Sequence, residues 1–430
     1  MSDTIAAIAT GNAVTAIGII RISGPKAIEA AGTLFSPLPQ EDRKLAYGEL
    51  KTTEGELLDL CLCTVCHGPA SYTGEDYAEI QCHGSPVVLR SILEELFRLD
   101  VRQARPGEFT RRAFLNGKMK LTEAEAVIDV IDAETRQAAV NAAGQLSGAI
   151  SRKTGKIYSG LTDICAHYHA ILDYPDEDIE PFEIEQYASL IDEYAGTLRK
   201  LADTARSGAL LKEGIPTAIV GSPNAGKSSL MNALLGYDRA IVTAKPGTTR
   251  DTIEEKIRIG DLILRLTDTA GIRETEDEAE KLGVERSYRA IDEAALVINI
   301  IDGTTGDEPI GRDCLVVYNK CDLPGFCGGE INISAKTGEG LEALKEAICR
   351  MFPVPDVPAG EILTNARQTE AVCTALEYLH AAEEALRAGA TPDIVLTEVE
   401  GAMKAIGELD GRTVREDVTN RIFARFCVGK

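Results

Sequence analysis

The stretch Pro216–Gly236, "PTAIVGSPNAGKSSLMNALLG", joins three local patterns. A run rich in β-branched residues leads into the glycine-containing loop Gly221–Ser228, and a helix-forming sequence follows. Glycines let backbone N–H groups close around phosphates, while Lys227 reaches the outer phosphates and the Ser228 hydroxyl ligates Mg²⁺. Strand, loop and helix in this order predict a nucleoside-triphosphate site, in preference to a plain glycine turn between packed elements.

A second motif predicts which base is bound. The run "VVYNKCD" ends in Asp322, whose carboxylate can accept from both N1–H and the 2-amino group of guanine. Adenine offers neither donor, and a buried carboxylate without a donor is costly, so this residue favours GTP. The "SAK" run, Ser334–Lys336, predicts a loop whose backbone donates to the guanine oxygen.

Two further motifs complete a GTPase pattern. "LTDTAG" supplies Asp268 to the Mg²⁺ shell and Gly271 to the γ-phosphate, and "KPGTTRD" supplies Thr248 or Thr249 as the switch residue. The predicted Mg²⁺ ligands are Ser228 and Thr249. The complete predicted GTP site is Asn224, Ala225, Gly226, Lys227, Ser228, Ser229, Thr248, Thr249, Asp268, Gly271, Asn319, Lys320, Asp322, Ser334, Ala335 and Lys336.

The residue that orients water for hydrolysis differs from the Ras pattern. Ras-type switches place glutamine after the glycine of the third motif, and here that position is Ile272. The transition state also needs a cation, and Arg250 and Arg273 lie nearby in sequence. The side-chain oxygen of Asn224 could instead hold a monovalent cation beside the phosphates. An asparagine bonded to its own loop backbone is the competing interpretation.

Composition indicates a globular protein of more than one domain. The chain has 430 residues, 44% hydrophobic and 26% charged, with a net charge of -23. That charge disfavours nonspecific coating of nucleic acid, although the segment 105–120, "RPGEFTRRAFLNGKMK", is locally basic. No run approaches the roughly 18 apolar residues of a membrane span, and Asp3 stands where a signal peptide would carry a cation. We expect a cytoplasmic protein with reduced thiols and no membrane partner.

One cysteine cluster has two interpretations. Cys63, Cys66 and His67 match the pattern of c-type haem attachment, and zinc is conceivable. The surrounding "LLDLCLCTVCH" alternates as a strand does, so a buried strand is the preferred interpretation.

The order of patterns predicts a multidomain α/β protein in which a GTPase domain is inserted into a helical domain. Residues 1–118 mix strand-like and helical runs as an α+β module, and 119–210 are helical. Residues 211–355 alternate strands and helices as a Ras-like P-loop domain with a mainly parallel sheet, and 356–430 are helical again.

Three local details accompany this plan. Thr122 and Glu125 predict a capping box at the start of the first long helix. A second long helix is expected to bury one face, formed by Ile184, Tyr187, Ile191, Tyr194, Leu198 and Leu201. Only sixteen residues separate Asp302 from Asn319, which is barely enough for a crossover, so one GTPase helix is expected to be short or missing.

Across nearly its whole length the chain resembles the tRNA-modifying GTPase family MnmE, also called TrmE. The resemblance rests on "GIIRISG", "SYTGEDYAEIQCHG", "RPGEFTRRAFLNGKMKLTEAEAVIDVIDA", "DYPDEDI", "GSPNAGKSSLMNAL", "PGTTRD", "DTAGIRE" and the terminal "FCVGK". It implies a homodimer joined through N-terminal domains and a GTPase activated when two GTPase domains meet in the presence of potassium. Asn224, Thr243 and Thr248 match the potassium site, and Glu280 matches the catalytic glutamate, although on composition alone Glu280 is one acid in a solvated run.

The resemblance also implies a reaction on RNA. Together with the FAD-dependent partner MnmG (GidA), in a complex of heterotetramer type, the family modifies C5 of the wobble uridine of certain tRNAs. A one-carbon unit from 5,10-methylene- or 5-formyl-tetrahydrofolate is added with an aminomethyl or carboxymethylaminomethyl group. The implied folate-binding residues are Arg21, Glu79, Lys118 and Lys430.

The C-terminus is expected to belong to that site. Val418, Ile422, Phe423 and Phe426 form an apolar face that should bury the last helix and tie the terminus down. Gly429 would allow close backbone approach, and Cys427 is expected inside the protein near the folate. A catalytic thiol and a buried packing cysteine are both compatible with this placement.

Two other functions compete with a tRNA-modifying enzyme. A regulatory GTPase of ribosome assembly should carry a basic RNA module, whereas the flanks here are helical and the chain is acidic. A folate-binding module with a structural nucleotide would show no cation-stimulated turnover. The motifs favour the modification enzyme.

Overall fold

A computed structural model describes residues 3–11, 13–174, 184–237, 255–266, 292–310, 313–413 and 416–430. The chain forms two compact units. The first consists of Met1–Ile128, Ser151–Gly160 and Met403–Lys430, and the second of Asp129–Ile150 and Leu161–Ala402.

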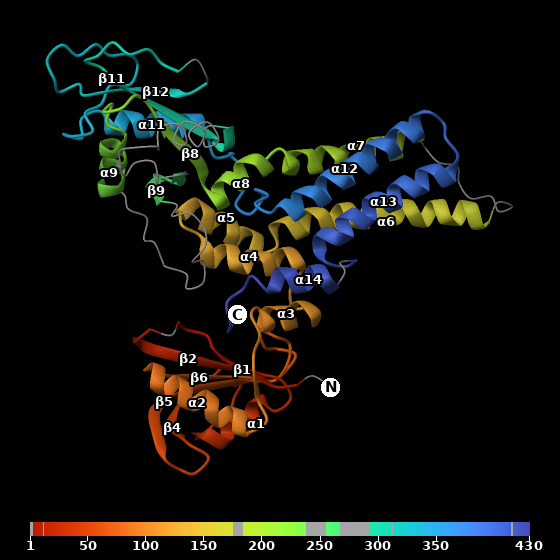
Figure 1. Cartoon of the computed structure of the whole chain (residues 1–430). Helices are drawn as coiled ribbons and strands as arrows, with labels where there is room; N and C mark the ends of the chain where they lie inside the picture. Colours follow the sequence, from red (N-terminus) through yellow and green to blue (C-terminus); the bar gives the residue numbers. More distant parts are fainter. Residues whose placement is uncertain are drawn as a thin grey trace. The chain divides into compact units, whose positions relative to one another are not determined.

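The first unit is built on a seven-stranded sheet with the order β3-β4-β5-β6-β2-β1-β7. Every pairing is antiparallel except that of β1 with β7. Two helices, α1 and α2, pack on it (Figure 1). These elements are β1 Ile5–Ile8, β2 Thr15–Ser23, α1 Ala27–Leu34, β3 Phe35–Ser36, β4 Ala46–Lys51, β5 Leu57–Cys66, β6 Tyr77–Gly84, α2 Pro86–Arg98 and β7 Arg102–Gln103.

Strand β5 settles how the cysteine cluster is folded. Cys61 and Cys63 point into the core that the sheet shares with α1 and α2, and Cys66 is buried as well. Burial raises the pKa of the Cys61 and Cys63 thiols to about 12, so both stay protonated at neutral pH. The interpretation of "LLDLCLCTVCH" as a buried strand is confirmed.

A small apolar core joins three helices of the chain, α3 (Glu108–Leu115), α4 (Leu121–Asp132) and α14 (Glu416–Phe423). Phe423 and Phe426 are buried with Leu121 and Ala124, and the ring of Phe114 lies 6.3 Å from that of Phe423. The expected burial of the last helix through these two phenylalanines is therefore confirmed.

The predicted capping box at the start of α4 is wrong. Leu121 is already helical, so the side chain three residues after the cap is Glu123, which accepts from the Lys120 backbone N–H at 3.0 Å. The Thr122 hydroxyl instead bonds that of Ser151 at 3.0 Å. Burial of Leu121 and Ala124 sets this register.

The second unit contains two helical segments that are distant in sequence. Helix α7 packs along α12, where Ile191 and Leu198 are buried on one helix and Val372 and Leu379 on the other (Figure 1). Ile184, expected on the buried face, is exposed at the first turn. This unit includes the helices α5 Arg136–Leu146, α7 Ile184–Ala202, α8 Ala205–Glu213 and α12 Ala366–Arg387. Helices α6 Ala149–Asp173 and α13 Pro392–Asp410 each contribute residues to both units.

The same unit holds a five-stranded sheet with the order β12-β11-β8-β10-β9. Its pairings are parallel except for β10 with β9. The elements are β8 Ile215–Val220, α9 Lys227–Tyr237, β9 Glu255–Ile259, β10 Leu262–Leu266, β11 Leu296–Asp302, β12 Leu315–Asn319 and α11 Leu341–Met351. In the described part of the link from β11 to β12, turns and coil appear and no helix, as the short spacing predicted.

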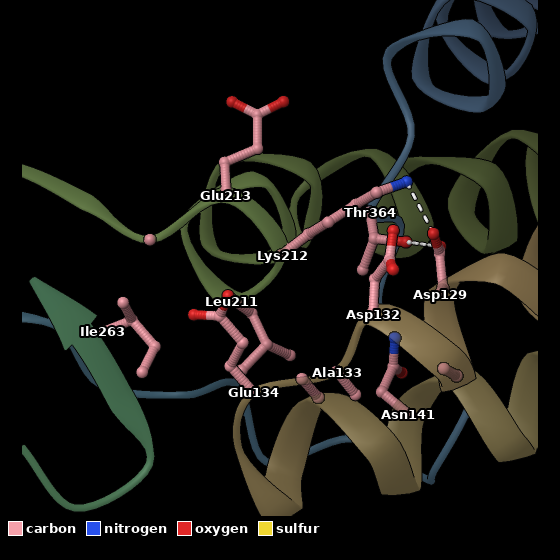
Figure 2. A pocket seen from close by; sticks show the side chains of 13 residues that line it. Asp129, Asp132, Ala133, Glu134, Asn141, Leu211, Lys212, Glu213, Ile263 and Thr364 are labelled. Carbon is pink, nitrogen blue, oxygen red and sulfur yellow. Dashed lines mark hydrogen bonds and ion pairs between the residues drawn. The ribbon is translucent and has the colours of Figure 1, made fainter. Parts of the chain in front are cut away.

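A small pocket lies where this sheet meets the helices (Figure 2). Lys212 pairs with Asp129 at 2.8 Å, and the Thr364 hydroxyl donates to the same carboxylate at 3.2 Å. Nearby, Lys256 of β9 pairs with Glu134 at 2.6 Å. The pocket volume of about 40 Å³ has room for only a few water molecules, so we interpret it as a packing gap between sheet and helices and not as a ligand site.

Candidate functional site

The phosphate loop follows the central strand β8. Gly221, Asn224 and Gly226 have φ values of +155°, +64° and +104°, and α9 starts directly after them at Lys227. A Cβ added at Gly226 would lie 2.1 Å from Nδ2 of Asn319, so only glycine fits there. Asn224, exposed on the loop, takes the left-handed conformation that asparagine tolerates.

The lysine of the loop lies across it. Its Nζ donates to the carbonyl oxygens of Gly221 and Ser222, at 2.8 and 3.0 Å. Burial lowers the pKa of Lys227, because the charged form loses hydration. Among the residues that the structure describes, the hydrogen-bond partners of this half-buried ammonium are neutral carbonyls, so it is a ready partner for phosphate oxygens. Ser228 and Ser229 follow it as exposed residues in the first turn of α9.

Asn319 connects the phosphate loop to the second base loop. Its Nδ2 donates to the Ala225 carbonyl at 2.8 Å, and its Oδ1 accepts from the Ala335 N–H at 3.0 Å. The side chain is buried. The sequence pattern assigned Asn319 only to nucleotide contact, whereas in the structure its amide fixes the spacing of the two loops.

The other base-loop residues meet at the same sheet edge, because parallel strands end together there. Lys320, at φ +70°, donates to Oδ2 of Asp302 at 2.5 Å. Asp322 is exposed, and the buried Ser334 hydroxyl accepts from the Thr337 N–H at 3.2 Å. Ala335 is buried and Lys336 exposed in that loop.

Asp302 is a contributor that sequence reasoning missed. It closes β11 and also accepts from the N–H and hydroxyl of Thr304, at 3.0 and 2.6 Å. Burial raises its pKa, but the hydrogen bonds from Lys320 and Thr304 outweigh burial, and the net pKa is lowered. The available signal was an acid at the end of the apolar run "VINIID", where the carboxyl ends of parallel strands gather.

Several predicted residues lie outside the described part of the chain. They are Thr243, Thr248, Arg250, Thr249, Asp268, Gly271, Ile272, Arg273 and Glu280.

A second cluster forms in the first unit between β2, β6 and the C-terminus. The Arg21 Nε pairs with Glu79 at 3.0 Å, and an Arg21 NH1 donates to the Gly429 carbonyl at 3.3 Å. The Tyr77 hydroxyl donates to Glu79 at 2.5 Å. Burial, and then the nearby Arg21 cation, lowers the pKa of Lys430. Tyr77, which sequence reasoning missed, sits two residues before Glu79 on the same strand face.

The C-terminal tail reaches this cluster through backbone contacts. Val428 forms an antiparallel bridge with Pro106, and the Phe109 N–H donates to the Lys430 carbonyl at 3.1 Å. At Gly429, with φ +97°, an added Cβ would lie 2.3 Å from the Ile8 carbonyl oxygen. The expectation of a tied-down terminus with a glycine at a close approach is confirmed.

Two expectations about this cluster need different answers. Cys427 is exposed, so its predicted position inside the protein is wrong; the tail turns its backbone inward, where the Cys427 carbonyl accepts from the Gly107 N–H at 3.3 Å. The exposed Lys118 donates to the Pro69 carbonyl at 2.9 Å. The structure brings together Arg21, Glu79 and Lys430. Lys118 instead contacts the loop that contains Pro69.

In the part of the chain that the structure describes, helices long and apolar enough to cross a membrane are absent.

Comparisons with known proteins agree along the chain. The model of the MnmE helical domain matches residues 121–427, and that of the GTP-binding protein TrmE N-terminus matches residues 4–118. Proteins named tRNA modification GTPase MnmE are similar to the chain over its full length. That of Symbiobacterium thermophilum is 39% identical over 100% of this chain and 99% of its own length. That of Acetivibrio thermocellus is 41% identical with the same two coverages.

A solved structure, the G domain of the FeoB iron transporter of T. maritima, is 25% identical over 31% of this chain and 96% of that domain, with a TM-score of 0.23. The full-length relatives and the helical-domain match decide the assignment. The chain belongs to the MnmE family of tRNA modification GTPases, a family of GTP-hydrolysing enzymes.

Proposed function

We propose that the chain couples GTP hydrolysis to modification of C5 of the wobble uridine in certain tRNAs. With an FAD-dependent partner of the MnmG type, it would add a folate-derived one-carbon unit and an aminomethyl-type group. The observation that carries this proposal is the return of the C-terminal tail to the N-terminal sheet, which sets Lys430 beside Arg21 and Glu79. The full-length similarity to tRNA modification GTPases supports it.

The part of the proposal that concerns GTP rests on the phosphate loop. Lys227 would exchange its two carbonyl partners for phosphate oxygens, and Asp322 would accept from guanine. We assign Mg²⁺ to Ser228 and Thr249, potassium to Asn224, Thr243 and Thr248, and the orientation of water to Glu280. Potassium would act when two GTPase domains of a homodimer meet, since it supplies the cation that the transition state requires.

The second cluster has the donor set that a reduced folate requires. The Glu79 carboxylate can pair with the amino-imino edge of a pterin, and Lys430 and Lys118 suit glutamyl carboxylates. Fully burying a cation without a partner is costly, so the half-buried Lys430 is better satisfied with an anion beside it. A bound 5,10-methylene- or 5-formyl-tetrahydrofolate would supply the one-carbon unit. The exposed Cys427 thiol would face the RNA side, as a nucleophile or proton carrier.

The architecture and location that accompany this function also remain proposals. We assign residues 1–118 to folate binding and dimerisation, 119–210 and 356–430 to the helical domain and 211–355 to the GTPase domain. We also propose a cytoplasmic location, where the protein would meet its tRNA substrate.

The test separates the tail from the GTPase. Cells whose only copy lacks residues 427–430 are compared with wild type by mass spectrometry of their digested tRNA, and the purified variant is assayed for potassium-stimulated GTP turnover. The deletion starts at Cys427 because Phe426 belongs to the core. We expect lost modification with retained turnover.

Matched point variants sharpen the result. Cys427→Ser should abolish modification, whereas Cys327→Ser changes an equally exposed cysteine of the GTPase domain and should preserve it. Full modification in the deletion strain would remove Cys427 and Lys430 from the site. Full modification in cells without the gene would refute the proposed function.

A further inference from the structure

A groove of about 830 Å³ opens in the first unit beside α3, and Lys118 is the one residue of its lining that the proposed function uses. It runs between the end of α3, the start of α4, the residues Asp410, Gly411 and Arg412 at the end of α13, and Thr419 of α14. The volume falls in the range of sites for ligands of nucleotide size. Its lining includes Arg111, Phe114, Lys118, Lys120, Asp410 and Arg412.

The groove is basic although the chain carries a net charge of -23. Four lining residues are cations, and the two carboxylates, Glu123 and Asp410, are engaged within the fold. Glu123 accepts from the Lys120 backbone at 3.0 Å, and Asp410 pairs with Lys120 Nζ at 2.7 Å. The lining therefore carries two more cations than carboxylates, and this net charge favours an anionic ligand.

One wall of the groove holds an unsatisfied acceptor. Asp410 is 4% exposed, and its Oδ1 has no hydrogen-bond partner among the described residues. Arg412 Nε lies 4.0 Å from the other oxygen, outside hydrogen-bond range. That oxygen is enclosed by the protein, so a ligand in the groove does not reach it, and Asp410 contributes to the groove through its ion pair with Lys120.

The rim of the groove offers flat and apolar surfaces. The Arg412 guanidinium lies 4.2 Å from the ring centroid of Tyr158, which holds its plane in place. Leu115 is 60% exposed on the opposite lip, next to the partly buried Phe114. Unstacked nucleic-acid bases rest on guanidinium planes and apolar rings, and lysines contact their phosphates.

We propose that this groove binds RNA and holds an unpaired segment of the tRNA substrate. This inference rests on the proposed function. Phosphates would meet Lys120 and Arg412, and an unpaired base would rest on the Arg412 guanidinium and the apolar surface of Leu115. An acidic protein segment would match the charge but has no flat bases to rest on the Arg412 guanidinium.

The experiment compares two charge reversals in the full-length protein. Arg412→Glu changes the groove, and Arg387→Glu changes an arginine of α12 that is similarly exposed (51% against 47%) and also lies beside a carboxylate. Binding to a fluorescent unmodified tRNA transcript is measured by anisotropy over a range of KCl, with the thermal midpoint of each variant.

We expect Arg412→Glu to weaken binding about tenfold at low salt and to reduce the salt slope by about 0.7–0.9, the value for one lost phosphate contact. Arg387→Glu should stay within about twofold of wild type, because distant charges are screened. Arg412→Lys should keep the slope. Leu115→Asp, on an exposed lip, gives a second readout that leaves the core intact and should weaken binding several-fold.

The outcomes separate the two proposals. Equal binding by wild type and both groove variants overturns the groove while tRNA binding stands. Equal losses in Arg412→Glu and Arg387→Glu also overturn it, because total charge would then explain the effect. Failure of the wild-type protein to bind the transcript overturns the groove and the tRNA part of the proposed function together.

Discussion

The two candidate sites are assembled in opposite ways. The phosphate loop lies within consecutive residues, and Asn319 then links it to the Ala335 loop. The cluster at the C-terminus joins residues from opposite ends of the chain, since Arg21 and Gly429 are 408 positions apart. Both depend on a glycine at positive φ against a neighbouring residue. A substitution can therefore disrupt the first site while the rest of its unit stays folded, whereas the second site depends on the fold of the whole first unit.

The largest expected effect is on the local site. Gly226→Ala would place a Cβ 2.1 Å from Nδ2 of Asn319 at φ +104°. We expect GTP binding to weaken about 100-fold, because strain and a displaced loop together cost roughly 2–3 kcal/mol. Titration with a fluorescent GTP analogue measures this.

Gly236→Ala is the matched control. Gly236 lies in α9 with open space around it, so alanine should bind GTP normally and slightly stabilise the helix. Normal GTP binding by Gly226→Ala would show that the loop tolerates a side chain, against the geometry described above.

A smaller effect is expected at the assembled site. Gly429→Ala would meet the Ile8 carbonyl at 2.3 Å and should detach the tail at a cost of about 1–3 kcal/mol. Hydrogen exchange should become faster at the Gly107 and Phe109 amides, which donate to the Cys427 and Lys430 carbonyls, and GTP binding should be unchanged. Gly11→Ala, at a site with open space, is the control. Unchanged exchange in Gly429→Ala would contradict the tight approach.

The smallest effect tests the pH dependence of the base loop. The pKa of Asp302 is lowered in the fold, so its stabilisation is present above its ordinary pKa and is lost as the pH falls through the lowered value. Asp302→Asn should cost roughly 1 kcal/mol at pH 7. Urea midpoints from pH 7 to pH 3 should show the difference from wild type shrinking in acid. A difference that is constant with pH would assign the effect to packing alone.

Predictability from sequence follows the same division. Three local features could be predicted from the sequence, because each depends on the spacing of neighbouring residues. They are the loop Gly221–Ser228, the buried strand β5 and the absence of a helix in the described part of the short segment 303–314. The capping residue of α4 and the exposure of Ile184 were predicted wrongly. Both depend on which helical register buries the larger apolar face, and that is decided by neighbours distant in sequence.

The sequence by itself determined a strand, loop and helix of the P-loop type. It also predicted a guanine-selective carboxylate and the insertion of one domain into another, and these stay predictions. Only the tertiary structure decided that Asn319 ties two loops together, that Asp302 holds Lys320, and that the Cys427 thiol faces outward. The physical reason is that local spacing fixes backbone conformation and periodic burial, whereas hydrogen-bond partners and exposure depend on which remote segments pack against each residue.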